Sequence, residues 1–190
     1  MSKHPLPQDL DWPPGTIFTV GHSTRPLEEF IALLADYGIT CLGDVRTVPR
    51  SRHNPQFNAD TLGPALQARK IEYAPLPALG GLRHARKDSP NGGWRNTSFR
   101  GYADYMQTDE FARGLEELIS LSRHERTAIM CAEAVPWRCH RSLVADALGV
   151  RGITVVEILS ATSYRNHKLT PFAHVEGTAI TYPPEKAALL

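Results

Sequence analysis

The densest group of reactive side chains in this sequence lies between residues 131 and 141. It contains two thiols, a carboxylate, an imidazole and two guanidinium groups, namely Cys131, Glu133, Arg138, Cys139, His140 and Arg141. The carboxylate can act as a general acid or base, and the imidazole can carry a proton near neutral pH. The guanidinium groups match the geometry of phosphate and can hold an anionic substrate. The group therefore predicts a catalytic site.

The position of this group along the chain favours anion binding. The pattern predicts a buried strand over residues 127–131 and a helix over residues 137–148 that ends at Gly149. Arg138 and Arg141 then fall in the first helical turn, where free backbone N–H groups bind anions. Cations there are unfavourable by a few tenths of a kcal/mol to about 1 kcal/mol. We therefore expect a compensating anion or carboxylate.

Cys131 has two interpretations. It is a nucleophile only if a helix N-terminus or a nearby cation stabilises its thiolate, and the adjacent carboxylate of Glu133 opposes that. An unreactive thiol buried in the strand is the alternative, because free cysteine is commonly buried. The sequence favours Glu133 or a histidine over Cys131 as the reacting group.

Two familiar cysteine motifs do not fit this segment. Cysteine phosphatases and rhodanese-like proteins place the arginine of their anion loop one position earlier, where this chain has Trp137. The two cysteines and His140 also lack the paired Cys-x-x-Cys spacing of structural zinc sites. We predict no metal ligand from spacing, and the sequence leaves any cofactor unknown.

Two other predicted strands end in polar residues that can join the same site. His22 and Ser23 follow the first strand, and Asp44 and Arg46 end the second. His22 is a candidate proton carrier or a hydrogen-bonding turn residue, and Ser23 is a candidate substrate contact. Asp44 is a second candidate acid or base and Arg46 a candidate anion ligand, although an ion pair between them is the simpler reading.

Basic residues recur between residues 46 and 100 among few acids, which indicates a local basic face. Arg52 in this stretch is a candidate anion ligand. Aromatic residues follow, and Tyr105 can stack on a base or pack in the core. Residues 77–100 are rich in glycine and predict a long surface loop.

Strands and helices alternate along the chain. Strands are predicted over residues 16–20, 39–45, 71–76, 127–131 and 153–159, and helices over 27–37, 60–70, 99–106, 110–122 and 137–148. This alternation predicts an α/β fold, a mostly parallel sheet of about five strands with helices on both faces, three-layered and Rossmann-like. Such folds bind ligands at the carboxyl ends of the strands. We predict a flexible arm over residues 1–15 and a single domain over residues 16–190.

The composition is that of an ordinary globular protein. The 190 residues carry a net charge of +1, so no global field favours nucleic acid or membrane. No apolar run approaches the roughly 20 residues that span a bilayer, and no secretory signal is visible. Three cysteines argue against a disulfide framework and for reduced thiols. We therefore predict a cytoplasmic protein without a membrane partner.

Five ordered motifs resemble a known family. They are Gly21-His22-Ser23, Asp44-Val45-Arg46 with Pro49 and Ser51, Leu79-Gly80-Gly81, Tyr102 with Tyr105-Met106, and Cys131 with Glu133 and Cys139-His140-Arg141. Together they resemble the bacterial domain of unknown function DUF488, over about residues 16–159. The resemblance implies an intracellular prokaryotic α/β protein and supplies no reaction.

Three hypotheses follow for the function. The first is an enzyme acting on a phosphate-bearing substrate, a nucleotide or nucleic acid, at the carboxyl edge of the sheet. The second is a non-catalytic module that binds nucleic acid or another anion through residues 46–100. The third is a metal-dependent hydrolase, with a metal held by His22, Asp44, Glu133 or His140.

Overall fold

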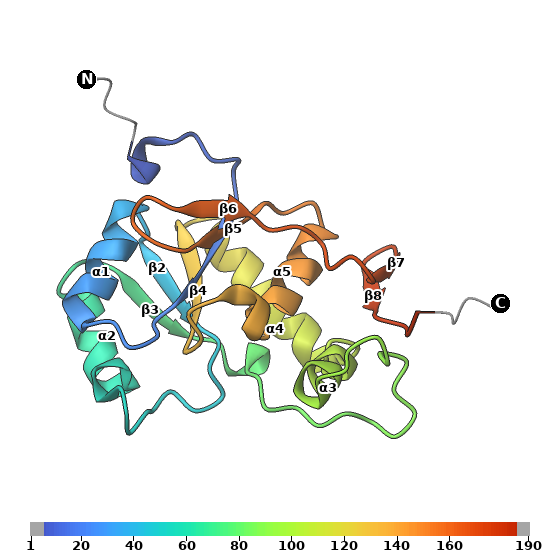
Figure 1. Ribbon diagram of the computed structural model, residues 1–190. Coiled ribbons are helices and arrows are strands. Elements are labelled where there is room, and N and C mark those ends of the chain that lie inside the picture. The colour runs from blue at the N-terminus through green and yellow to red at the C-terminus, as the bar shows by residue number, and fades with distance from the viewer. Residues whose placement is uncertain (1–5, 186–190) are drawn as a thin grey trace.

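The computed structural model describes residues 6–185 and shows a sheet with helices on both faces (Figure 1). The strands are β1 (Ile17–Gly21), β2 (Cys41–Asp44), β3 (Glu72–Pro75), β4 (Thr127–Cys131), β5 (Val155–Ile158), β6 (Tyr164–Asn166), β7 (His174–Glu176) and β8 (Ala179–Thr181). The helices are α1 (Leu27–Asp36), α2 (Ala59–Gln67), α3 (Thr97–Tyr105), α4 (Asp109–Ser122) and α5 (Arg141–Gly149). Short 3₁₀ helices span Pro7–Asp9, Pro55–Phe57, Pro77–Leu79 and Pro136–Arg138.

The main sheet has the strand order β3-β2-β4-β1-β5-β6. Strands β1 to β5 pair in parallel, whereas β6 pairs antiparallel with β5. The predicted α/β architecture with a mostly parallel sheet is confirmed. The prediction of about five strands missed β6, because all three of its residues are exposed and carry no alternating apolar pattern. The short hairpin of β7 and β8 was missed in the same polar tail.

Alternate residues of the strands enter two separate cores. Phe18 and Val20 of β1 pack with α1 and α2 on one face of the sheet, whereas Ile17 packs with α3, α4 and α5 on the other. Figure 1 shows the same division of the helices between the two faces. Successive side chains of a strand point to opposite faces, so a buried run such as β1 is apolar on both sides.

The predicted start of one helix is confirmed and that of another is wrong. Helix α1 begins at Leu27 as predicted, with Pro26 as its N-cap residue. Helix α5 begins at Arg141 rather than at residue 137, because a separate 3₁₀ turn occupies the residues between Pro136 and Arg138. Of the predicted cations, Arg141 therefore lies in the first turn of α5 and Arg138 precedes it.

The carboxyl ends of β1, β2 and β4 lie side by side at one edge of the sheet. Gly21 is opposite Cys131, and Asp44 is opposite Met130. A Cβ atom at Gly21 would lie 1.8 Å from the main-chain oxygen of Glu133, so only glycine lets the chain after β4 cross the end of β1. The polar strand ends predicted to meet therefore do meet, at the point where the strand order reverses.

The segments before β1 and after β6 both pack against the main sheet and its helices. Trp12 contacts Phe18 and Tyr164 edge-on, with ring centroids 5.5 and 5.2 Å apart. Residues 1–5 of the predicted arm lie outside the described residues, and the flexibility of the arm stays a prediction. In the segment that follows β6, the His167 imidazolium donates hydrogen bonds of 2.7 Å to Asp146 of α5 and 2.8 Å to Glu157 of β5.

The His167 network predicts a loss of stability at alkaline pH. Burial disfavours the imidazolium, but hydrogen bonds to Asp146 and Glu157 outweigh burial and raise the pKa of His167 to about 9. Because the folded pKa lies above the ordinary value, this stabilisation is complete below pH 6.5 and disappears as the pH rises through 9. We expect the free energy of unfolding in urea to fall by about 2 kcal/mol between pH 6 and pH 9.5. The His167→Gln variant should lose less over this range, and an equal loss would contradict the assignment.

Candidate functional site

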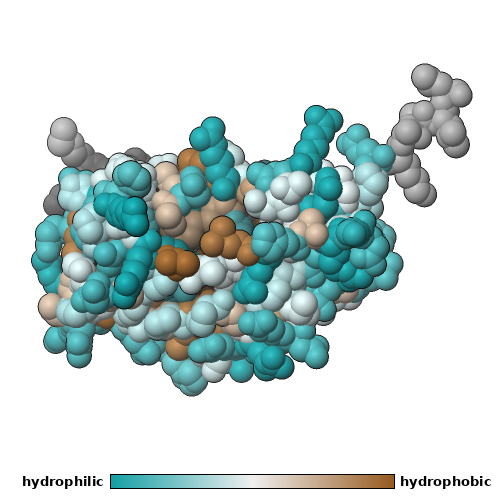
Figure 2. All heavy atoms as spheres, turned by 90° about the horizontal axis from the view of Figure 1, so that it is seen from below, coloured by the Kyte–Doolittle hydropathy of each residue, from teal (hydrophilic) through white to brown (hydrophobic). Residues whose placement is uncertain are grey.

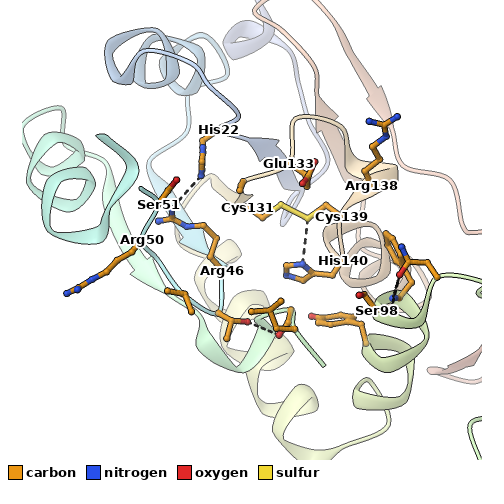
Figure 3. Close-up of a pocket in the computed structure, with 18 residues that line it drawn as sticks. His22, Arg46, Arg50, Ser51, Ser98, Cys131, Glu133, Arg138, Cys139 and His140 are labelled. Carbon is orange, nitrogen blue, oxygen red and sulfur yellow. Dashed lines mark hydrogen bonds between the residues drawn. A yellow bond between two sulfur atoms is a disulfide. The ribbon is translucent and has the colours of Figure 1, made fainter. Parts of the chain in front are cut away.

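A pocket of about 530 Å³ opens at the carboxyl edge of the sheet (Figure 3). Its walls come from the segments that follow β1, β2 and β4, from Gly81 and Leu82, and from the start of α3. This volume lies within the usual range of small-molecule sites. Six of the predicted site residues line it, namely His22, Arg46, Cys131, Glu133, Arg138 and His140. The other five, Ser23, Asp44, Arg52, Tyr105 and Arg141, do not.

Arg46 is held rigidly by Asp44. Its Nε donates to Oδ1 of Asp44 at 2.9 Å and its Nη2 to Oδ2 at 2.6 Å, and both side chains are buried. The Tyr73 hydroxyl donates to the same carboxylate at 2.6 Å. Asp44 and Arg46 thus form the predicted internal ion pair. The Nη1 group of Arg46 remains directed at the pocket, toward Nε2 of His22 at 3.5 Å.

His22 has a defined tautomer. Its Nδ1 donates to the main-chain oxygen of Ser23 at 2.8 Å, which leaves Nε2 as the unprotonated nitrogen beside Arg46. The ring stacks on Phe57 with centroids 4.2 Å apart. Burial and then the Arg46 guanidinium lower the pKa of His22 below its ordinary value. The imidazole is therefore neutral at pH 7 and can accept a proton at Nε2.

Ser23 contributes its backbone rather than its hydroxyl. Its φ is +51°, in the left-handed region, and its N–H donates to the main-chain oxygen of Ala132 at 2.9 Å. The turn after β1 is thereby tied to the turn after β4. Ser23 orients His22 through its carbonyl, and its proposed contact with substrate stays a prediction.

His140 is also neutral and faces the sulfur of Cys139. Its Nε2 lies 2.9 Å from the main-chain oxygen of Val45, and its Nδ1 lies 3.6 Å from Sγ of Cys139. Burial lowers the pKa of His140 to about 4. Gly81 packs against the ring, since a Cβ atom there would lie 3.0 Å from Nδ1. The absence of a side chain at Gly81 thus lets the loop approach this histidine closely.

Arg141 lies behind the pocket wall, where its side chain is 1 % exposed. Its Nε donates to Sγ of Cys131 at 3.0 Å and its Nη2 to the main-chain oxygen of Glu133 at 2.7 Å. Its Nη1 donates to the Thr19 hydroxyl at 3.3 Å. The structure therefore places this predicted anion ligand beside the Cys131 sulfur, where each of its three nitrogens already donates a hydrogen bond.

Cys131 and Cys139 are joined as a disulfide at the floor of the pocket (Figure 3). The expectation that all three thiols are reduced is therefore wrong, and Cys41 is the free cysteine, buried in β2. The turn that begins at Pro136 folds the chain back over the end of β4 and brings the two sulfurs together. The spacing of the two cysteines along the sequence does not predict this reversal of the chain.

Exposed charges surround the pocket. Arg50, Glu133 and Arg138 line it, and neither arginine forms an ion pair within residues 6–185. In Figure 3 the side chains of Arg50 and Arg138 lie at two different sides of the pocket and extend outward. Reasoning from the sequence selected Arg52 in place of Arg50. Arg50 and Arg52 lie in the same polar loop, and only the path of that loop in space decides which of them reaches the pocket.

The aromatic residues near the pocket serve mainly as structural contacts. The Tyr105 hydroxyl donates to the main-chain oxygen of Ala78 at 2.6 Å, and the Arg83 guanidinium lies 3.6 Å from its ring centroid. Tyr102 donates to Leu79 at 2.7 Å and also lines the pocket. Both tyrosines thus anchor the 3₁₀ helix at Pro77–Leu79 to α3, and base stacking by Tyr105 stays a prediction.

Two further features of the described residues bear on the hypotheses. Between residues 6 and 185, no group of three or more histidine, cysteine, aspartate or glutamate side chains is arranged to hold a metal ion. The donors named for a metal-dependent hydrolase are not assembled there. Nor is any helix in this part of the chain long and apolar enough to cross a bilayer.

The family model for the domain of unknown function DUF488 matches residues 26–148. This stretch contains 123 of the 190 residues, well over half of the chain. The chain belongs to the DUF488 family. The matched region runs from just before α1 to the end of α5, so it contains most of the pocket but not His22. No curated protein and no solved structure matches the chain.

The crossing at Gly21 supplies a test of how the site is assembled. In the Gly21→Ala variant the added methyl meets main-chain atoms of Glu133 and Ala134, which cannot move aside like a flexible side chain. We expect a loss of about 1–3 kcal/mol in the free energy of unfolding. Gly149→Ala is the matched control, because nothing lies within 4 Å of its Cβ position. Equal stabilities of the two variants in urea unfolding would refute the close crossing.

Proposed function

We propose that this protein is an enzyme that hydrolyses a phosphate ester of a nucleotide or of a nucleic-acid end. The observation that carries the proposal is the pairing of a proton acceptor with an anion ligand. Nη1 of Arg46, which does not contact Asp44, donates a long hydrogen bond of 3.5 Å to the unprotonated Nε2 of His22 on the wall of one pocket. General-base hydrolysis of a phosphate ester needs both groups near the reacting phosphorus.

The charge balance of the pocket favours an anionic substrate. Three guanidinium groups line it, those of Arg46, Arg50 and Arg138, against the single carboxylate of Glu133. Asp44 balances the charge of Arg46, but its carboxylate accepts hydrogen bonds only from Nε and Nη2 of that arginine side chain. The excess is therefore positive and lies mainly in the exposed Arg50 and Arg138, which can attract an anion and close on it.

One wall of the pocket suits the organic part of a nucleotide. Phe99 presents partly exposed aromatic surface, and Val48 and Leu82 present exposed aliphatic surface. Figure 2, the view from below, shows small brown areas surrounded by hydrophilic surface on this side of the molecule. Aromatic rings stack on bases of any sequence. The pocket volume of about 530 Å³ accommodates one nucleotide rather than a duplex.

The geometry suggests how the reaction proceeds. Nε2 of His22 takes a proton from water as the water oxygen bonds to phosphorus, and the ester P–O bond breaks. Arg46 stabilises the negative charge on the phosphoryl oxygens, and its ion pair with Asp44 keeps it in place. The proton on His22 then passes to the leaving oxygen. Glu133 lines the same pocket and is the second candidate acid–base group.

A non-catalytic anion-binding module is the second candidate. Arg50, Arg52 and Arg138 are all exposed, and no ion pair neutralises any of them within residues 6–185. This role predicts steeply salt-dependent binding without turnover.

Replacement of His22 tests the catalytic role. We expect purified protein to hydrolyse at least one member of a panel of nucleotides and aryl phosphate esters. The His22→Asn variant should lower kcat by about 10²- to 10⁴-fold with little change in KM. Because the pKa of His22 is lowered, the wild-type rate should be level across neutral pH and fall only in acid. The exposed His124 supplies the control variant His124→Asn, and equal rates in the two variants would remove His22 from the mechanism.

Replacement of the exposed arginines tests substrate binding. Arg50→Ala and Arg138→Ala should each weaken the affinity for a nucleotide about fivefold at low salt, which corresponds to about 1 kcal/mol. The effect should shrink as salt is added, because exposed charges are screened. Arg113→Ala on the outer side of α4 is the control, and calorimetric titration gives the affinities. Unchanged binding in both pocket variants would contradict the proposed anion site.

A further inference from the structure

The sulfur atoms of Cys131 and Cys139 have an environment that phosphate-ester hydrolysis does not use. The two residues are 3 % and 4 % exposed, yet both line the pocket. Each sulfur faces a different nitrogen base or cation, Nε of Arg141 at 3.0 Å for Cys131 and Nδ1 of His140 at 3.6 Å for Cys139. This asymmetry distinguishes the roles of the two sulfurs.

Arg141 is a buried cation that lacks a carboxylate partner within residues 6–185. Its acceptors are one sulfur, one hydroxyl and one main-chain oxygen, and none of them carries a formal charge in the disulfide state. Burial lowers the pKa of Arg141 to about 10, although the carboxylates of Glu157 and Glu133, which form no ion pair with it within residues 6–185, act in the opposite direction. A buried charge requires a counter-charge. A thiolate on Cys131 would supply it.

Glu133 does not cancel this effect. Its main-chain oxygen accepts from Arg141, while the residue itself is exposed, so water screens its carboxylate. The repulsion expected from the sequence is therefore smaller than the attraction of a buried guanidinium in direct contact with the sulfur.

His140 is arranged to receive the proton of Cys139. Its Nε2 donates to the main-chain oxygen of Val45, so its Nδ1 carries the lone pair. That lone pair faces Sγ of Cys139 at 3.6 Å. A neutral histidine oriented in this way is a general base for the second thiol.

We propose that Cys131 and Cys139 form a dithiol that reduces hydroperoxides, with Cys131 as the reacting thiolate and Cys139 as the resolving thiol. The Cys131 sulfur attacks the terminal peroxide oxygen, the O–O bond breaks, and the leaving alkoxide takes a proton to become an alcohol or water. The sulfur is oxidised to a sulfenic acid as the peroxide is reduced by two electrons. A hydroperoxide is small enough to reach sulfurs that a protein partner cannot.

The second step closes the disulfide. Nδ1 of His140 takes the proton of Cys139, and the resulting thiolate attacks the Cys131 sulfur. The S–S bond forms, the S–O bond breaks, and hydroxide leaves with that proton as water. One hydroperoxide and two thiols thus become a disulfide, an alcohol and water. A small dithiol reductant restores the reduced pair, and a leaving thiolate stabilised by Arg141 favours that exchange.

Cys41 supplies an internal reference. It is buried in β2 outside the pocket, and burial raises the pKa of its thiol to about 11. Both properties make a thiol unreactive. Peroxide should therefore oxidise the pocket pair and leave Cys41 intact.

The test uses the full chain reduced with dithiothreitol and then freed of it. One equivalent of hydrogen peroxide should remove two hydrogen masses from the intact protein, and peptide mapping should locate the bond between Cys131 and Cys139. In the Cys139→Ser variant the reaction should stop at the sulfenic acid, so that dimedone labels Cys131 and leaves Cys41 unlabelled. Peroxide should oxidise Cys131 at least about tenfold faster than Cys41.

Arg141 is a positioning residue in this proposal, and its contribution has its own readout. In the Cys139→Ser background, alkylation of Cys131 by iodoacetamide should reach half of its maximal rate well below pH 8.5, the ordinary thiol value. Arg141→Met should move this midpoint upward, and Arg141→Lys should restore part of the shift, with circular dichroism reporting whether each variant folds.

Three results would overturn the proposal: equal oxidation rates of Cys131 and Cys41, no disulfide in the peptide map, or an alkylation midpoint at or above pH 8.5. None of these measurements uses a phosphate ester. Failure of the dithiol proposal therefore leaves the hydrolase proposal standing, and the reverse also holds.

Discussion

The buried guanidinium of Arg141 connects the parts of the structure that form the site. It contacts the side chain of Thr19 in β1, the sulfur of Cys131 at the end of β4, and the main-chain oxygen of Glu133 in the following turn. Since Arg141 is the first residue of α5, the same contacts fix where that helix begins. A cation buried to this degree stays only if its donors are satisfied, so the strand ends and the turn are held in one arrangement.

Around this cation, the pocket combines two neutral histidines with arginines that are either paired or exposed. His22 and His140 are each oriented by one main-chain oxygen and keep one unprotonated nitrogen, whereas Arg46 is paired with Asp44. Arg50 and Arg138 remain exposed at the opening. The two proposals use different halves of this arrangement, since His22 and Arg46 serve the phosphate ester while His140 and Arg141 serve the sulfurs.

Much of the fold could be predicted because burial imposes a period on the sequence. The apolar runs that became β1, β2 and β4 are buried along their whole length, and Gly38 ends α1 with a φ of +65°. Strand β6 could not be predicted, because its three residues are exposed and its register depends on pairing with β5. The start of α5 was predicted four residues too early, because a 3₁₀ helix and the first turn of an α-helix have similar local sequence patterns.

By itself, the sequence determined which residue types gather at the strand ends, because parallel strands separated by helices must place their carboxyl ends on one edge. His22, Arg46, Cys131, Glu133, Arg138 and His140 reach a common pocket for that reason. The tertiary structure alone decided which way each side chain faces and what it contacts. It placed Arg141 against Cys131, Asp44 against Arg46 and the two sulfurs together, because hydrogen bonds and charge pairs between distant segments depend on distances that no local pattern encodes.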